Sequence, residues 1–221
     1  MKISTSERFH SLLIILLLTI MINPLLEEMT ILRVVFDIAL SLILIVGCFT
    51  ISRYKITPWI AMALAIPMLL YTWSTQFGFK IPYLDIIGTI SGIAYFALIA
   101  VTILIFIFTT RSVKGEVISA ALVVYLLLGV LWGYGYTLID LIQPGSFNVP
   151  DHFIGAEGYS YMYYSFITLT TVGYGDITPI SGMARSLSML EGIIGQSYMA
   201  VLVARLVGMH VAISMTKSSR K

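Results

Sequence analysis

The chain has 221 residues, of which 58% are hydrophobic and 11% are charged, and its mean hydropathy is +0.96. Soluble domains carry about 25% charged residues, so this composition excludes a soluble domain and indicates an integral membrane protein in contact with lipid. A net charge of +2 without a basic, aromatic-rich patch argues against nucleic acid as a partner, and the single cysteine, Cys48, excludes an intrachain disulfide.

Six long apolar segments follow one another along the chain, each near or above the roughly 20 residues that a membrane-spanning helix needs. They occupy residues 9–26, 31–52, 56–75, 84–110, 116–141 and 183–214. The first is the weakest, because Asn23-Pro24 interrupts it. We prefer a membrane helix there to the apolar core of a signal peptide, since Glu27-Glu28 follows it in place of a small-residue cleavage site. The pattern predicts an all-α membrane protein with six transmembrane helices.

The basic residues gather on one side of the membrane if the N-terminus is cytoplasmic, as the positive-inside rule requires. Ten of the thirteen Lys and Arg residues then face the cytoplasm: Lys2, Arg8, Arg53, Lys55, Arg111, Lys114, Arg205, Lys217, Arg220 and Lys221. The acidic residues show the opposite bias, with Glu27, Glu28, Asp85, Asp140, Asp151, Glu157 and Asp176 outside. The two biases predict a multi-pass protein of the cell membrane with cytoplasmic N- and C-termini.

The first four segments form one predicted block, residues 1–115, which lacks a voltage sensor. A sensor helix carries several Arg or Lys residues inside the membrane, so that charge moves through the electric field. Segment four contains Asp85 and no base. Residues 116–215 form the second predicted block, the pore domain. Residues 216–221 form a short cytoplasmic tail, in which no ligand-binding domain fits.

The most informative stretch lies between segments five and six and reads Thr170-Thr171-Val172-Gly173-Tyr174-Gly175-Asp176. A potassium ion must shed its water to cross a membrane selectively, and successive backbone carbonyls can replace that water if four strands face one axis. Gly173 and Gly175 tolerate backbone dihedrals barred to other residues, which lets the chain turn its carbonyls inward. Thr171 can add a hydroxyl oxygen at the inner end.

This stretch resembles the selectivity filter of tetrameric potassium channels, and residues 116–213 resemble the pore of small bacterial channels of the two-helix-pore type. The resemblance implies a homotetramer with a selectivity-filter loop and a re-entrant pore helix over residues 161–171, although the local propensity there leans towards strand. It implies ion coordination by Thr171, Val172, Gly173, Tyr174 and Gly175, with Asp176 at the outer mouth. Permeant K⁺ at the filter is the one metal expected, and no cofactor is expected.

Two positions of the pore helix depart from the pattern of the relatives. Some relatives carry a Glu that pairs with the outer-mouth acid behind the filter, and this chain has Ile167 there. Tyr163 and Tyr164 stand where relatives often carry paired Trp. We expect a hydroxyl of this pair to bond to Asp176 or Tyr174 in place of the missing Glu.

Segment six carries the residues that could line the cavity or move. Gly195 matches the position of the hinge glycine in the inner helix of potassium channels, and close helix packing is the alternative interpretation. Gln196, Met199 and Val203 repeat at helical spacing, which predicts a stripe on the cavity wall. Glu191 is an acid within the membrane, a costly and usually functional placement. We expect it off the pore axis, where, as a protonated or paired acid, it holds subunits together or, as the alternative, takes part in gating.

Together these features predict one subunit of a potassium-selective channel that conducts passively and is not strongly voltage-gated. The alternatives are a potassium-uptake translocation subunit driven by a partner, or a less selective cation channel. The single intact filter counts against the uptake subunit, because such proteins carry four degenerate filter repeats in one chain. A membrane enzyme ranks third, because the sequence offers no nucleophile–base pair, and His10, His152 and His210 have no metal-ligand neighbours at useful spacing.

Overall fold

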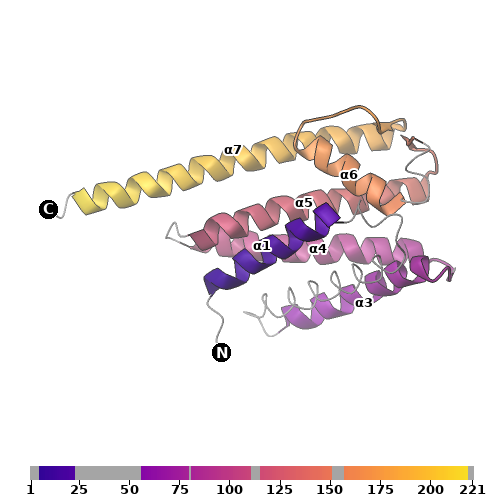
Figure 1. The fold of residues 1–221 in the computed structure, drawn as a ribbon, viewed down its shortest axis with the longest axis horizontal. Helices are drawn as coiled ribbons and strands as arrows, with labels where there is room; N and C mark the ends of the chain where they lie inside the picture. Colours follow the sequence, from indigo (N-terminus) through magenta and orange to yellow (C-terminus); the bar gives the residue numbers. More distant parts are fainter. Residues whose placement is uncertain (1–4, 23–55, 80, 111–114, 151–156, 219–221) are drawn as a thin grey trace.

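The computed structural model describes residues 5–22, 56–79, 81–110, 115–150 and 157–218. This part of the chain is almost entirely helical (Figure 1). The helices are α1 (Thr5–Ile22), α3 (Thr57–Gln76), α4 (Leu84–Thr109), α5 (Gly115–Ile142), α6 (Glu157–Leu169) and α7 (Gly182–Ser218), and two short strands, β1 (Phe147–Asn148) and β2 (Thr178–Pro179), lie between them.

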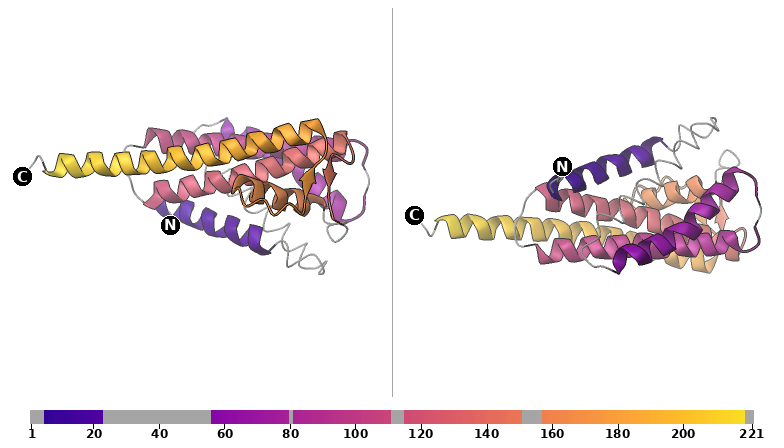
Figure 2. Two further views of the ribbon diagram at one scale, coloured as in Figure 1. Left: turned by 90° about the horizontal axis from the view of Figure 1, so that it is seen from above. Right: turned by 90° about the horizontal axis from the view of Figure 1, so that it is seen from below.

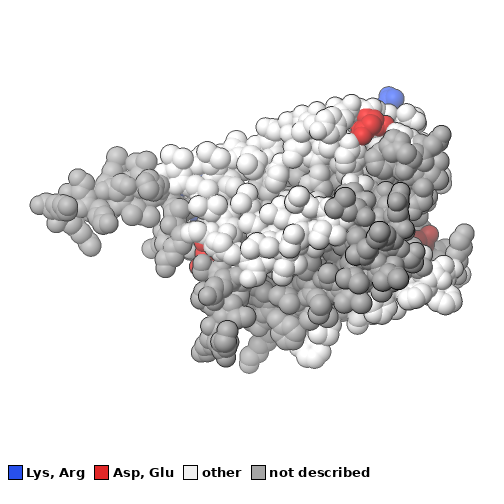
Figure 3. Space-filling model, viewed as in Figure 1, with Lys and Arg blue, Asp and Glu red and all other residues white. Residues whose placement is uncertain are grey.

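Three of these helices are long and apolar enough to cross a membrane: α4, α5 and the portion Gly182–Gly208 of α7. On the face shown in Figure 3, the described charged side chains lie towards the ends of the molecule, and the described surface between them shows no charged side chain. The predicted all-α membrane fold is confirmed. The predicted segment at 31–52 lies outside the described residues, so the count of six transmembrane helices stays a prediction.

The helices pack as a bundle in which α5 is the central element. It contacts α4, α1, α6 and α7, and α3 packs on the far side of α4 (Figures 1 and 2). One apolar core joins α1, α3, α4 and α5, with fully buried members such as Tyr95, Val123 and Val124. The two predicted blocks therefore share a core where α1 and α4 meet α5, and the division at residue 115 stays a prediction.

A second core lies between the outer half of α5, α6 and the start of α7, and it is rich in aromatic rings. Tyr136 of α5 and Tyr164 of α6 meet edge to face with their centroids 5.0 Å apart, and Phe147 of β1 packs against both rings. The antiparallel pair β1–β2 closes this end, with Phe147 opposite Pro179 and Asn148 opposite Thr178. This core fixes the short helix α6 against two long ones.

The helix α7 differs from its predicted bounds and stands apart from the bundle. It runs to Ser218, so it includes the first three residues of the predicted tail at 216–221. Its N-terminal part packs on α5 and α6, and its C-terminal part projects beyond the other helices (Figure 1). Only 17% of the residues in its most apolar stretch are buried, against 61% for α5. Most side chains in this stretch of α7 are therefore not buried by the described part of the chain.

Candidate functional site

The predicted filter loop, residues 170–176, begins as the C-terminal cap of α6. The Thr171 amide donates to the Thr168 carbonyl at 3.0 Å, and the Val172 amide donates to the Ile167 carbonyl at 2.9 Å. These two bonds, with Thr171 at φ +59°, are the Schellman arrangement that ends many helices, except that a threonine occupies the left-handed position usually held by glycine. The predicted pore helix at 161–171 is confirmed as a helix, but it ends at Leu169 because the chain reverses its handedness at Thr171.

Positive φ values alternate along the loop. They occur at Thr171, Gly173 and Gly175, with φ of +59°, +53° and +79°, and not at Val172 or Tyr174. Such alternation turns successive peptide planes relative to one another, so the loop is neither helix nor regular strand. Residues 170–175 are all exposed in the single chain. The loop between α6 and Asp176 is therefore largely uncovered by the rest of its own chain.

Asp176 anchors the outer end of the loop. Its Oδ2 accepts a hydrogen bond of 2.6 Å from the Tyr163 hydroxyl, and its Oδ1 accepts one of 3.0 Å from the Ile177 amide. The predicted bond between a tyrosine of the pair and Asp176 is confirmed, and it is made by Tyr163, whereas the Tyr164 hydroxyl contacts Ser188 of α7. Burial, and the hydrogen bond and charge of Asp176, raise the pKa of Tyr163, so its hydroxyl remains a donor at neutral pH.

At the inner end of the loop, α7 supplies a polar contact. The Gln196 amide nitrogen lies 3.3 Å from the Thr171 hydroxyl and donates to it. Met199 and Val203, one and two turns further along, are exposed in the single chain, while Leu202 is buried. The structure thus brings Gln196 to the base of the filter and leaves Met199 and Val203 uncovered on α7. Their role as cavity lining stays a prediction.

Gly195 lies where α7 crosses the C-terminal end of α6. A Cβ atom added to Gly195 would lie 2.6 Å from the Leu169 carbonyl oxygen, a backbone atom that cannot move aside as a side chain does. The same carbonyl accepts a 3.3 Å hydrogen bond from the Tyr125 hydroxyl of α5. This geometry favours the packing interpretation of Gly195 over the hinge, because a side chain there would separate α7 from the base of the filter.

Glu191 is completely buried, one turn before Gly195. Its carboxyl group contacts the Tyr136 hydroxyl of α5 through Oε2 and the Ser165 hydroxyl of α6 through Oε1. Both partners belong to its own chain, and neither belongs to the filter loop. The sequence identified Glu191 but neither partner, since nothing in the local pattern around Tyr136 or Ser165 distinguishes them from other polar residues of apolar helices.

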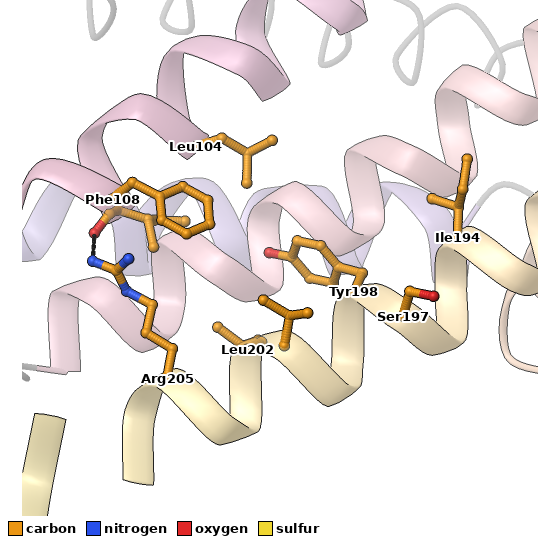
Figure 4. Close-up of a pocket in the computed structure, with 9 residues that line it drawn as sticks. Leu104, Phe108, Ile194, Ser197, Tyr198, Leu202 and Arg205 are labelled. Atoms are coloured by element: carbon orange, nitrogen blue, oxygen red, sulfur yellow. Dashed lines mark hydrogen bonds between the residues drawn. The ribbon is translucent and has the colours of Figure 1, made fainter. Parts of the chain in front are cut away.

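A groove between α4 and α7 has an arginine at one end (Figure 4). The guanidinium of Arg205 donates to the Ile107 carbonyl at 2.6 Å and lies 4.5 Å from the centre of the Phe108 ring. It therefore caps the C-terminal end of α4, where a positive charge is favourable. The groove has a volume of about 320 Å³ and is otherwise lined almost entirely by apolar atoms from Leu104, Ile194, Tyr198 and their neighbours. Arg205 joins the N-terminal helices to α7, a contact that the sequence analysis did not predict.

No group of three or more His, Cys, Asp or Glu side chains in the described part of the chain could hold a metal ion. The oxygen atoms suited to a cation are the carbonyls of the loop, the Thr171 hydroxyl and the carboxylate of Asp176. Carbonyl and hydroxyl oxygens are the ligands that hard cations prefer, and neutral oxygens suit a monovalent ion that must leave as easily as it enters.

Comparison with known proteins points to the same half of the chain. Residues 116–211, which lie within the predicted second block, match a family model described as "Ion channel". A stretch of 88 residues is 34% identical to "Two-pore potassium channel 2" of Arabidopsis thaliana, covering 40% of this chain and 18% of that protein. The chain thus matches less than a fifth of the length of this relative. No solved structure matches. Both matches are to channels and neither is to an enzyme, so the membrane-enzyme alternative is set aside.

Proposed function

We propose that this chain is one subunit of a homotetrameric, potassium-selective channel that conducts K⁺ passively across the cell membrane. The observation that carries the proposal is the alternation of positive φ at Thr171, Gly173 and Gly175 within the sequence Thr-Val-Gly-Tyr-Gly. That alternation suits a row of carbonyls aimed at one axis, which is what dehydration and coordination of K⁺ require.

Selective conduction follows from how the loop is held. Four loops on a four-fold axis form a cage in which carbonyls of Thr171 to Gly175 replace the water of the ion, and the Thr171 hydroxyl adds an innermost ligand. The C-terminal end of α6 lies at the inner end of this cage, and its negative dipole end stabilises a cation approaching from the cavity. The Tyr163–Asp176 bond restrains the outer end, so the cage keeps its width when an ion leaves.

Assembly into a tetramer is supported by the surface that one chain leaves exposed. The filter residues Val172 and Tyr174 are 52% and 72% exposed in the single chain, and the outer face of α7 carries exposed apolar residues such as Ile193 and Val207. A row of carbonyls cannot face lipid without hydrogen-bond partners, so the loop must face water, ions or other protein. A four-fold arrangement gives it an aqueous axis and lets neighbouring copies cover α7.

The orientation of the proposed channel rests on its charges. With both termini in the cytoplasm, the Tyr174 end of the filter faces outside and Arg205 lies at the cytoplasmic end of α7. The helix α4 has Asp85 in its first turn and no base in its last, and its sequence contains no Lys or Arg at all. We therefore propose a channel whose N-terminal helices stabilise the pore and do not sense voltage.

The test is current through the purified protein reconstituted alone in planar bilayers, with K⁺ on one side and Na⁺ on the other. We expect ohmic currents that reverse close to the K⁺ equilibrium potential. A reversal potential near zero, indicating equal permeabilities, would show a less selective cation channel. Flux that requires an energised partner would show an uptake subunit instead.

A further inference from the structure

The buried cluster around Glu191 contains more hydrogen-bonded contacts than its hydroxyl groups have hydrogens to donate. Three contacts join it: Tyr136 with Glu191, Ser165 with Glu191, and the Ser165 hydroxyl with the Gly129 carbonyl of α5 at 2.7 Å. Each hydroxyl has one hydrogen to donate. Tyr136 and Ser165 together supply two, and a carbonyl oxygen supplies none.

A proton on Glu191 supplies the third hydrogen that the three contacts need. Tyr136 then donates to Oε2, Ser165 donates to the Gly129 carbonyl, and the carboxylic acid donates from Oε1 to the Ser165 oxygen. With an ionised Glu191, one of the two contacts of Ser165 would bring a pair of acceptor oxygens together with no hydrogen between them. A buried carboxylate would also lack a counter-charge, because no Lys, Arg or His in the described part of the chain interacts with Glu191.

Within the described part of the chain, the titratable groups that face Glu191 are tyrosines. Tyr125 and Tyr136 face it from α5, and Tyr164 faces it from α6. On α7 itself, the nearby polar group is Ser188, which donates to the Ala184 carbonyl and accepts from Tyr164. Neutral tyrosines stabilise a carboxylate only through donated bonds, and one such bond is available, from Tyr136.

We infer that Glu191 is held as a neutral carboxylic acid whose own proton bonds to Ser165, and that this bond positions α6, and with it the filter, against α7. Ser165 lies two residues before Ile167, whose carbonyl accepts the amides of both Val172 and Gly173 at the start of the filter. The inferred protonation state of Glu191 rests on the contacts within the fold and does not depend on the proposed function. The effect on the filter rests on the proposed function. Glu191 does not touch the ion and acts as a positioning residue.

The glutamine variant separates the neutral acid from the carboxylate. In Glu191→Gln, the amide N–H can donate to Ser165 and the amide oxygen can accept from Tyr136, which reproduces the bonds of the acid. Glu191→Leu and Ser165→Ala each break the link to α6. Ser197→Ala, at a solvent-accessible serine that lines the groove beside α4, is the matched control for loss of a serine hydroxyl.

The direct measurement is the infrared spectrum of the purified protein in lipid at neutral pH. We expect a carbonyl-stretch band of a protonated carboxylic acid that disappears in Glu191→Gln and persists in Asp176→Asn. Absence of such a band in the unmodified protein, or its persistence in Glu191→Gln, overturns the inference. This measurement needs no ion current, so it decides the protonation state even if the protein proves not to be a channel.

Thermal unfolding in lipid gives the second measurement. We expect Glu191→Gln and Ser197→Ala to melt close to the unmodified protein, and Glu191→Leu and Ser165→Ala to melt roughly 5 °C lower or more. Raising the pH should lower the melting temperature of the unmodified protein and leave that of Glu191→Gln unchanged, because only the former must keep a proton. A glutamine variant as unstable as the leucine variant would overturn the inference.

The positioning role has its own readout. The K⁺/Na⁺ permeability ratio should fall several-fold in Ser165→Ala and stay within about twofold of the unmodified protein in Glu191→Gln. An unchanged ratio in Ser165→Ala, together with the infrared band, would keep the neutral acid and remove its role at the filter. If the unmodified protein itself carries no selective current, the proposed function fails and the infrared and melting results still stand.

Discussion

Thr171 ends the helix α6 and also begins the proposed filter. A left-handed conformation costs a residue with a Cβ atom about 1–2 kcal/mol, and helices usually end in glycine for this reason. Glycine would remove the hydroxyl, which lies within reach of Gln196 and of an ion at the inner end. The helix cap and the coordinating group therefore compete for one position, and threonine meets both needs at the cost of backbone strain.

Gly175 shows the complementary case. There is space for a side chain at this position, and only the backbone conformation restricts which residue can occupy it. Its φ is +79°, and nothing lies within 4 Å of an added Cβ atom. Gly175→Ala should fold but favour a different peptide orientation, and we expect the K⁺/Na⁺ permeability ratio to fall about tenfold or more, which corresponds to about 1.4 kcal/mol. Gly182→Ala, equally uncrowded but without a positive φ, is the control and should keep its selectivity. A selective Gly175→Ala channel would contradict the role given to this residue.

Tyr163 should matter through its hydroxyl rather than its ring. Tyr163→Phe removes the hydroxyl that donates to Asp176 and keeps the bond of Asp176 to the Ile177 amide, a loss we expect to be about 1–3 kcal/mol. We predict a lower K⁺/Na⁺ permeability ratio and briefer open periods in single-channel recordings. Tyr83→Phe, at an exposed tyrosine outside the site, is the control. Equal behaviour of the two variants would show that the bond to Asp176 does not restrain the filter.

At the scale of elements, the crossing of α6 and α7 depends on the missing side chain of Gly195. Gly195→Ala should force α7 away from the Leu169 carbonyl, so we predict a lower melting temperature together with reduced selectivity. Gly192→Ala, one turn earlier with nothing within 4 Å of the added atom, should affect neither property. A Gly195→Ala channel that kept its stability and selectivity and changed only its opening would restore the hinge interpretation.

The faces of α7 can be mapped by cysteine reactivity in a background in which Cys48 is replaced. Cysteines at Gln196, Met199 and Val203 should react with internally applied thiol reagents and block current. Ser197 and Leu202 should react less, because Leu202 is buried and Ser197 lines the groove beside α4. The reverse pattern would show that the cavity lies on the other side of α7, and Glu191 would then need a new position as well.

Sequence reasoning succeeded where a residue type has one physical use and failed where contacts join distant elements. The filter motif and the apolar segments predicted the loop and the helices, and the replacement of paired Trp by Tyr predicted the bond to Asp176. Local propensity at Tyr163 and Tyr164 would have given a strand. The contacts of Glu191 with Tyr136 and Ser165, and of Arg205 with Ile107, depend on tertiary packing across 26 to 98 residues of sequence. No local pattern encodes them.

For the whole molecule, we expect the lack of Lys and Arg in α4 to make the response to voltage weak. Moving one charge through 100 mV is worth about 2.3 kcal/mol, and an uncharged helix gains nothing from the field. We predict an open probability that changes little with voltage in planar-bilayer recordings between large positive and negative potentials. A steep conductance–voltage curve, equivalent to several charges per subunit, would contradict this prediction.

The buried acid of α7 also bears on how the chain enters the membrane during synthesis. The mean hydropathy of the best stretch of α7 is 1.4, against 2.6 for α4 and 2.2 for α5, so α7 is the least apolar of the three spans. An ionised acid at the middle of an inserting helix raises the free energy of membrane insertion by about 2.5–3.5 kcal/mol. Tyr136 and Ser165 both precede Glu191 in the chain, so the ribosome has already made both partners when α7 emerges. Of the three described spans, α7 is thus made after the helices that carry the partners of its acid, and we expect those helices to ease its insertion.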